Sequence, residues 1–342
     1  MNKILTLIIP TYNMEKYLRR CLDSLIIEED GMKHLEVLVI NDGSKDSSSQ
    51  IAYEYHDKYP DTFKVIDKEN GNYGSCINRG LNEMRGKYVK VLDADDWFDN
   101  KCFRNYLYFL RNVECDMVLT SFSRVDNDGK ILQSMLWNID GNKIIPIENL
   151  PLENIEMHGI TYRSDILKST KYRQTEGISY TDTEWSMIPI QYANNYIYYP
   201  EALYQYVIGR DGQTIQPDVF VRNYDQLLVV CRKVLSEYDF SKYNNKADRY
   251  IRYKFSIVLD FIYRTIILND FQINLKPLIC FDEYLKSKHI IIYNMLGNIK
   301  LSRKLRINYI CIWRNNNFST GNIILRAYII YNKIKHYVIK LK

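Results

Sequence analysis

Short apolar runs alternate with longer segments of helical periodicity over residues 1–122. The short runs are rich in Val, Ile and Leu, which is typical of buried parallel strands; they are 4–9, 35–40, 63–66, 88–92 and 117–122. The longer segments carry apolar residues at helical spacing; they are 15–27, 47–59, 75–84 and 99–112. This order predicts an α/β protein in which a doubly wound, Rossmann-like mixed sheet is flanked by helices.

The composition changes near Pro217, where long segments rich in Tyr, Ile, Lys and Asn begin. These segments contain few glycines and one further proline, Pro277, so they predict a mainly helical C-terminal region. The chain of 342 residues is longer than the roughly 100–200 residues usual for one domain. We therefore expect an α/β domain over 1–215 and a helical, basic region over 216–342.

Polar clusters follow three of the predicted strands, at the point where each strand ends. They are 10–13 (Pro-Thr-Tyr-Asn), 41–44 (Asn-Asp-Gly-Ser) and 93–96 (Asp-Ala-Asp-Asp). Doubly wound sheets bind their ligands beyond the carboxyl ends of the strands. The sequence therefore predicts a ligand site at this edge of the sheet.

The third cluster has the chemistry of a cation site. Asp93 and Asp95 are two residues apart in an extended segment, so their carboxylates point the same way, and carboxylates suit Mg²⁺ and Mn²⁺. An acidic loop that caps the next helix, where Asp99 would serve equally well, is the alternative. The cluster alone does not decide between the two interpretations.

The second cluster contains Asp42, whose carboxylate can accept a hydrogen bond from a base or a ribose hydroxyl. A turn that leads into the helix near Ser47 is the alternative. No GxGxxG follows the first strand and no GxxxxGK[ST] occurs in the sequence, so a dinucleotide dehydrogenase and a P-loop enzyme are both disfavoured.

The charge is divided unevenly along the chain. The net charge is +5, but residues 242–342 hold 19 Lys and Arg against 5 Asp and Glu, a charge of +14, which leaves −9 for residues 1–241. A basic segment of this kind fits an anionic surface, and we favour a membrane face over a nucleic acid. Arg326, Lys333 and Lys340 share one stripe of a helix, although Lys335 and Lys342 fall nearly opposite, so a solvated helical subdomain stays open.

The cysteines and the first apolar run bear on location. Seven cysteines form no CxxC pair, which favours a reducing, cytoplasmic compartment. The run 4–9 is shorter than the roughly 7–15 residues of a signal-peptide core. No uninterrupted apolar run approaches the roughly 20 residues of a membrane span.

Together, the order and spacing of these motifs resemble the family 2 glycosyltransferases of the GT-A fold, which use nucleotide-sugar donors. The matching stretches are 8–13, the helix through Leu18, Leu22 and Leu25, and 39–44, 78–80, 86–88 and 91–96. The resemblance is high across 4–100 and weaker to about 215. It implies a donor-binding half over about 1–100 and an acceptor half over about 101–215.

The resemblance implies donor-binding roles for residues of the first two clusters. Pro10, Thr11 and Asn13 would line the nucleotide pocket, and Asp42 would accept a hydrogen bond from uracil or another base. Asp93, Ala94 and Asp95 correspond to the family's acidic motif, and the resemblance implies that they bind the donor. Asp93 would contact the ribose or the metal, and Asp95 would bind the Mn²⁺ or Mg²⁺ that bridges the diphosphate.

The same resemblance implies three further candidate residues, one with an amide side chain and two with basic side chains. Many members carry an Arg directly before the Asn that corresponds to Asn78, whereas this chain has Ile77 there and Arg79 afterwards. We keep Asn78 and Arg79 as candidate donor-binding residues. Arg210, in the later segment 204–214, is the candidate cation for the leaving diphosphate.

The acceptor hydroxyl needs a base, and the acidic segment 180–185 resembles the family's base motif, with Thr181 in place of the usual Glu. Asp182 is therefore the candidate base and Glu184 the second choice. The local sequence fits a helix N-cap equally well. His158 is compatible with the acceptor side, but we interpret it as a packed or solvated residue.

The resemblance implies an inverting hexosyltransferase with Mn²⁺ or Mg²⁺ as cofactor. It would move sugar from a nucleotide diphosphate-sugar, a UDP-sugar being our expectation, to a glycan or polyprenyl-linked acceptor in bacterial cell-surface polysaccharide synthesis. We expect it in the cytoplasm, at the inner face of the plasma membrane. A sugar-1-phosphate nucleotidyltransferase and a non-catalytic carbohydrate- or membrane-binding module are the alternatives. The sequence does not identify the sugar, the linkage or the oligomeric state.

Overall fold

The computed structural model describes residues 3–141, 143–210, 213, 216–242, 246–268, 273–300 and 307–330, which form two compact units. Unit 1 takes the described residues of Met1–Pro151, Ile155–Gln213 and Asn245–Ala247. Unit 2 takes those of Leu152–Asn154, Thr214–Asn244 and Asp248–Lys342. Residues 214 and 215, next to the expected boundary between 215 and 216, lie outside the described part, so that boundary stays a prediction.

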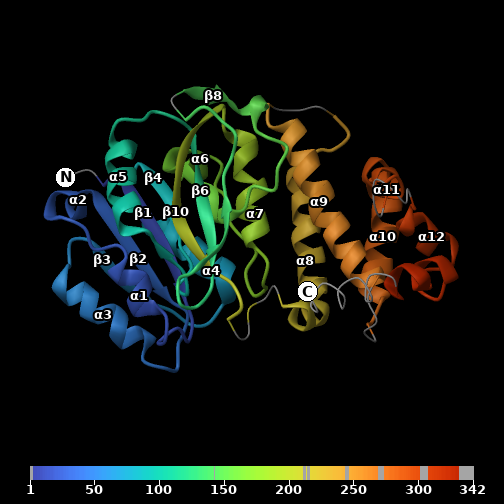
Figure 1. Cartoon of the computed structure of the whole chain (residues 1–342), viewed down its shortest axis with the longest axis horizontal. Helices are drawn as coiled ribbons and strands as arrows, with labels where there is room; N and C mark the ends of the chain where they lie inside the picture. Colours follow the sequence, from blue (N-terminus) through green and yellow to red (C-terminus); the bar gives the residue numbers. More distant parts are fainter. Residues whose placement is uncertain are drawn as a thin grey trace. The chain divides into compact units, whose positions relative to one another are not determined.

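The first half of the sheet in unit 1 is parallel, and its strands follow the predicted apolar runs. They are β1 (Leu5–Thr11), β2 (Leu35–Asn41), β3 (Phe63–Asp67) and β4 (Tyr88–Val91), in the order β3-β2-β1-β4 (Figure 1). Every residue of β2 is buried, because helices cover both faces of a parallel sheet. The continuous apolar sequence of β2 is thus explained by its burial on both faces of the sheet.

Helices connect these strands: α1 (Leu18–Asp23), α2 (Glu29–His34), α3 (Ser48–Lys58) and α4 (Asn72–Glu83). The periodicity predicted helices at α1, α3 and α4, whereas α2 was not predicted. α4 packs very closely on β1 at Gly80, where an added Cβ would lie 2.6 Å from Cγ2 of Ile8. Any side chain at this position would force α4 away from the sheet.

The second half of the sheet is mixed. It continues from β4 through β9 (Ile160–Arg163), β6 (Met117–Val125), β10 (Asn195–Val207) and β5 (Trp97–Phe98), with β7 (Ile131–Met135) beside β6 and β8 (Ile144–Pro146) beside β10. β9 runs antiparallel to β4 and β6, whereas β10 runs parallel to β6. The predicted fold class, a mixed sheet flanked by helices, is therefore confirmed.

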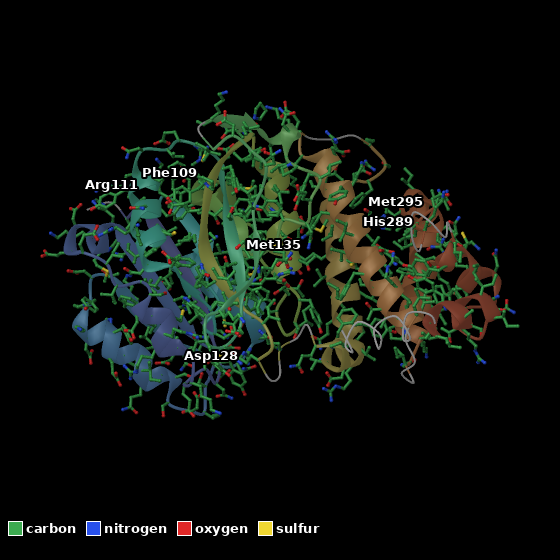
Figure 2. All side chains as sticks on the ribbon, viewed as in Figure 1. Phe109, Arg111, Asp128, Met135, His289 and Met295 are labelled. Carbon is green, nitrogen blue, oxygen red and sulfur yellow. The ribbon has the colours of Figure 1, made fainter. Side chains whose placement is uncertain are left out.

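Three helices and three 3-10 turns complete unit 1. They are α5 (Asn100–Arg111), α6 (Ser164–Ser169), α7 (Asp182–Met187), η1 (Ile147–Asn149), η2 (Met157–Gly159) and η3 (Pro189–Tyr192). The turn between β6 and β7 is held by Asp126, whose Oδ1 accepts hydrogen bonds from the backbone N–H groups of Asp128 and Lys130. Asp128 is labelled in Figure 2. Turn chemistry therefore accounts for Asp126.

Unit 2 is helical, as expected for the C-terminal region. Its helices include α8 (Pro217–Glu237), α9 (Asp248–Ile267), α10 (Lys276–Lys288), α11 (Ile290–Gly297) and α12 (Tyr309–Asn315) (Figure 1). Buried Asp282 joins three of them, because Oδ1 accepts 2.7 Å hydrogen bonds from Tyr263 Oη and from Arg314 Nη2. Among the described residues, we find no helix with both the length and the apolar character needed to cross a membrane.

Candidate active site

The three polar clusters lie at the same edge of the sheet, because β2, β1 and β4 are adjacent and parallel. The loops after β1 and β2 are joined directly. The backbone N–H of Asn13 donates to Ser44 Oγ at 3.1 Å, and Asn13 Oδ1 accepts from the N–H of Lys45 at 2.8 Å. Asn13 adopts φ +54°, a left-handed conformation that Asn tolerates better than most residues. Thr11 is buried beside it, and Pro10 is half-buried.

Asp42 is fixed by its neighbours at the end of β2. Its Oδ1 accepts hydrogen bonds from Lys68 Nζ at 2.5 Å and from the N–H of Gly71 at 3.0 Å. The side chain is 4% exposed, against 20% for Lys68. Sequence reasoning did not single out Lys68, which follows β3 and sets the charge balance around Asp42.

The carboxylates after β4 have three different environments. Tyr73 Oη donates to Asp93 Oδ1 at 2.8 Å. Asp96 is held at both carboxylate oxygens, since Oδ2 accepts from Tyr204 Oη at 2.7 Å and Oδ1 accepts from the N–H of Val207 at 2.8 Å. Asp96 therefore fastens β10 to the acidic loop.

Asp95 pairs with a residue far along the chain. Arg210 Nε donates to Asp95 Oδ2 at 2.7 Å, and the two side chains are 19% and 12% exposed. Ala94, between the acids, is buried and has no group that could bind a ligand through its side chain. Residues 211, 212, 214 and 215, next to Arg210 in the predicted segment, lie outside the described part.

The crowding of these acids changes their titration. Burial, and next the charge of Asp95, raise the pKa of Asp93 to about 6. Burial and Asp95 also raise the pKa of Asp96 well above its ordinary value. Acidic groups that repel one another in a closed space favour a bound cation, and such perturbed groups are typical of functional sites.

One group of side chains has the composition of a cation site. Ligand atoms of Asp93, Asp96 and His158 lie within 4.8 Å of one another. Carboxylate oxygens and an imidazole nitrogen are suitable ligands for Mn²⁺, and oxygens for Mg²⁺. Asp93 was predicted as a ligand, whereas Asp96 and His158 were not. Asp95, the other predicted ligand, is engaged by Arg210 and lies outside this group.

His158 is packed, as we expected, but it also faces the acidic loop. Its ring stacks on Tyr206 with centroids 4.2 Å apart. Lys90 Nζ donates to its carbonyl oxygen at 2.5 Å, and Lys90 is fully buried, which lowers the pKa of its amino group to about 7. The sequence around His158 does not indicate that this residue lies beside the acidic loop, because its contact with Lys90 joins residues 68 positions apart.

The two candidate bases differ sharply. Asp182 is the first residue of α7, and its side chain is exposed. Burial and the charge of Asp95 are the main causes that raise the pKa of Asp93, and the negative charge of Asp182 adds to them. Glu184 is fully buried, and its Oε2 accepts from the N–H of Thr175 at 2.9 Å. A buried carboxylate that holds a loop is poorly placed to meet an incoming hydroxyl.

The side chains of Asn78 and Arg79 lie in different surroundings. Asn78 Nδ2 donates to the carbonyl oxygen of Gln174, and Asn78 Oδ1 accepts from the N–H of Gln174. Its amide therefore holds the loop that precedes α7. Arg79 pairs with Glu83 at 2.9 Å on the exposed face of α4. Their donor-binding roles stay predictions.

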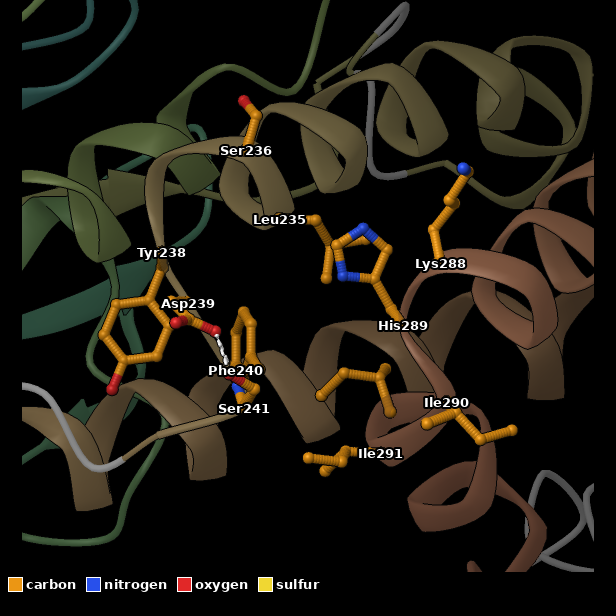
Figure 3. A pocket seen from close by; sticks show the side chains of 11 residues that line it. Leu235, Ser236, Tyr238, Asp239, Phe240, Ser241, Lys288, His289, Ile290 and Ile291 are labelled. Atoms are coloured by element: carbon orange, nitrogen blue, oxygen red, sulfur yellow. Dashed lines mark hydrogen bonds between the residues drawn. The ribbon is translucent and has the colours of Figure 1, made fainter.

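Unit 2 contains a separate pocket of about 390 Å³ (Figure 3). It lies between the end of α8, the segment after it and the junction of α10 with α11. Leu235, Phe240 and Ile292 supply apolar walls, and Lys288 and Asp239 supply charge. Asp239 Oδ1 is held by Ser241. The lining lacks the acidic cluster found in unit 1.

The basic stripe predicted for the C-terminal region is only partly described. Arg326 lies within the described residues, whereas Lys333, Lys335, Lys340 and Lys342 lie outside them. Elsewhere in unit 2, Ile290 and Ile291 are 52% and 46% exposed at the start of α11. Lys286 and Lys288, also exposed, lie within four residues before Ile290.

Sequence comparisons bear on this geometry. The family model described as "Glycosyl transferase family 2" matches residues 6–169, which include both candidate donor-binding clusters and the acidic loop. The minor teichoic acid biosynthesis protein GgaB of Bacillus subtilis (strain 168) is 28% identical over 211 residues. That alignment covers 61% of this chain and 23% of GgaB. The chain thus spans less than a quarter of the length of this relative.

Two solved structures share the fold. S. aureus TarS 1–349 matches with a TM-score of 0.61 at 21% identity, over 82% of this chain and 79% of that segment. The complex of TarS 1–349 with UDP-GlcNAc also matches, with a TM-score of 0.57. Mannosyltransferase PcManGT from Pyrobaculum calidifontis, in complex with GDP-Man and Mn²⁺, matches with a TM-score of 0.54 at 14% identity, over 98% of this chain and 87% of PcManGT. At these identities the likeness concerns the fold.

Proposed function

We propose that the protein moves a sugar from a nucleotide diphosphate-sugar to a hydroxyl group of an acceptor, because the model of glycosyl transferase family 2 matches residues 6–169. One observation carries the proposal. The carboxylates at the ends of β2 and β4 share one edge of the sheet, because these strands flank β1 and run parallel to it. Donor-binding and reacting groups would thus be neighbours.

The donor is a UDP-sugar in this proposal. TarS, which shares the fold, has been solved with UDP-GlcNAc and with UDP, and this supports the choice. Pro10, Thr11 and Asn13 would line the pocket of the nucleotide, and Asp42, held by Lys68, would accept a hydrogen bond from the base. The firm placement of Asp42 favours a fixed orientation of the base.

A divalent cation, Mn²⁺ or Mg²⁺, is the proposed cofactor. Asp93, Asp96 and His158 would hold it, and Asp95, predicted as a ligand, would become available when Arg210 leaves it. The Mn²⁺ complex of PcManGT supports this choice. Such an ion stabilises negative charge on a leaving diphosphate.

Asp182 would accept the proton of the acceptor hydroxyl. The hydroxyl oxygen forms a bond to the anomeric carbon as the bond from that carbon to the diphosphate oxygen breaks, so the configuration inverts. The nucleoside diphosphate leaves with the electron pair, and Arg210 would stabilise its charge. The exposed position of Asp182 gives an acceptor access to its carboxylate.

The acceptor is a glycan or a polyprenyl-linked glycan of cell-surface polysaccharide synthesis in this proposal. The similarity to GgaB, a minor teichoic acid biosynthesis protein, supports this class. We place the protein in the cytoplasm at the inner face of the membrane. All seven cysteines, each in a described segment, are free, which fits a reducing compartment. Ile290 and Ile291 beside Lys286 and Lys288 are the residues proposed to touch anionic lipid.

A screen of nucleotide-sugars tests the proposal. Purified protein is incubated with UDP-, GDP- and TDP-sugars in Mn²⁺ or in EDTA, and free nucleoside diphosphate is measured. We expect turnover of one donor class that requires the cation. Pyrophosphate release from a nucleoside triphosphate and a sugar 1-phosphate, without turnover of any nucleotide-sugar, would instead support a nucleotidyltransferase.

A further inference from the structure

Glu156, a residue outside the acidic loop, faces His158. Glu156 Oε2 lies 3.4 Å from His158 Nδ1. Nδ1 is buried and makes no hydrogen bond to a described residue. Buried polar atoms without a partner are rare in proteins, so this one needs an explanation. Glu156 is the acid positioned to supply it.

Glu156 is itself held in place. Arg124 Nη2 donates to Glu156 Oε1 at 2.7 Å, and the Glu156 side chain is 18% exposed. One carboxylate oxygen therefore faces the arginine and the other faces the imidazole. Arg124 belongs to β6, the strand next to β9, so the chain of contacts rests on the sheet.

The His158 ring has little freedom to turn away from Glu156. Its face lies against Tyr206, and the edge contact with Tyr204 has centroids 4.8 Å apart. Lys90 fixes the backbone at His158 by donating to its carbonyl oxygen. The orientation of the ring is thus set by packing, and the carboxylate acts on a ring that is already placed.

A carboxylate beside Nδ1 has a specific chemical effect. A neutral imidazole carries one N–H, and an acceptor next to Nδ1 keeps that hydrogen on Nδ1. Nε2, which points away from Glu156, then keeps its lone pair. Histidines that bind metals usually have such a carboxylate behind them, and its loss costs about 10–100-fold in metal affinity.

We infer that Glu156, held by Arg124, is a positioning residue that prepares His158 Nε2 to bind the divalent cation together with Asp93. The inference rests on the proposed function, because that function supplies the need for a cation. Glu156 touches neither donor nor acceptor in this account and acts through His158 alone.

The first test measures the tautomer of His158 in the full chain without metal. Protein labelled with ¹⁵N at histidine is studied by NMR, and His158→Gln assigns the signal. We expect hydrogen on Nδ1 in the wild type and a mixture of the two tautomers in Glu156→Gln. Hydrogen on Nε2 in the wild type, or the same tautomer in both proteins, would overturn the inference.

The second test measures Mn²⁺ affinity from the EPR signal of the free ion. Glu156→Gln keeps the shape of the side chain, and we expect it to bind Mn²⁺ about 10–100-fold more weakly than the wild type. Arg124→Met should change the affinity in the same direction. Glu54→Gln is the matched control, because Glu54 also pairs with an arginine, Arg19 at 2.8 Å, at an exposed position.

The outcomes separate this inference from the proposed function. If His158→Gln weakens Mn²⁺ binding while Glu156→Gln binds as the wild type does, the inference is wrong and the cation site stands. If the wild type shows no saturable Mn²⁺ binding, the cation proposal fails and the inference fails with it. If donor turnover then proceeds without a cation, the proposed sugar transfer stands and only the proposed cofactor is wrong.

Discussion

Arg210 Nε donates a 2.7 Å hydrogen bond to Asp95 Oδ2, and this contact joins residues 115 positions apart. The two side chains have separate proposed roles, Arg210 at the leaving diphosphate and Asp95 at the cation. While they are paired, each neutralises the charge that the other would offer to a ligand. A cation and Arg210 therefore compete for Asp95 before the donor binds.

Replacement of Arg210 tests this competition. We expect Arg210→Met to bind Mn²⁺ several-fold more tightly without nucleotide, because Asp95 loses its competing cation. We expect kcat to fall by about 10²–10³-fold, as for the loss of one group that stabilises transition-state charge. EPR titration and donor turnover measure the two effects. Arg19→Met, at the exposed pair with Glu54, is the control. A lower Mn²⁺ affinity in Arg210→Met would contradict the competition.

Asp182 is expected to act in the chemical step alone. Asp182→Asn should lower kcat by about 10²–10⁴-fold, the usual contribution of a general base. Because Asp182 is exposed, we expect the free energy of unfolding to change by less than about 0.5 kcal/mol. Steady-state kinetics and thermal unfolding measure these quantities. Asp165→Asn, at an exposed acid in the first turn of α6, should match the wild type. A wild-type kcat in Asp182→Asn would exclude Asp182 as the base.

Variants of the ion pair between Asp42 and Lys68 distinguish an effect on donor binding from an effect on stability. Asp42→Asn leaves Lys68 without its charged partner, and we expect a loss of about 1–3 kcal/mol in the free energy of unfolding. The affinity for UDP should fall as well. The double variant Asp42→Asn/Lys68→Met should regain part of the free energy of unfolding, because the two residues are in contact and their effects on stability are not additive. Its affinity for UDP should stay low, because the carboxylate of Asp42 is still missing. Calorimetry and chemical unfolding measure both. Recovery of UDP binding in the double variant would mean that Asp42 acts only through Lys68.

The exposed isoleucines of unit 2 test the membrane contact. Ile290→Asp/Ile291→Asp should reduce sedimentation with vesicles that contain anionic lipid, since it removes apolar area and adds negative charge. Val229→Asp, at a 45% exposed apolar position of α8, is the control. Binding to anionic vesicles should weaken as salt rises. Equal sedimentation of the two variants would argue that another surface, or none, meets lipid.

The sequence predicted the features that local patterns encode. Strands β1, β2 and β4 follow from short apolar runs, and the polar residues after them follow from the edge at which parallel strands end. The resemblance to family 2 glycosyltransferases, now supported by the family match over 6–169, identified the acidic loop.

Contacts between distant segments could not be predicted in this way. His158 reaches the acidic loop because β9 runs antiparallel between β4 and β6, and no local period encodes that insertion. Lys90 lies in an apolar run, yet its full burial depends on carbonyl oxygens 68 and 70 positions away. The pairing of Asp95 with Arg210 depends on β10 in the same manner. Long-range packing decides these positions.

Donor turnover by Asp95→Ala is the most direct test of the central claim that a nucleotide-sugar reacts at the acidic loop with a divalent cation. The variant and the wild type are compared in saturating Mn²⁺, with nucleoside diphosphate as the product measured. Asp128→Ala, at an exposed acid in the β6–β7 turn, is the control. We predict that turnover falls by at least about 10²-fold in Asp95→Ala and is unchanged in the control. Turnover by Asp95→Ala equal to that of the wild type would contradict the account.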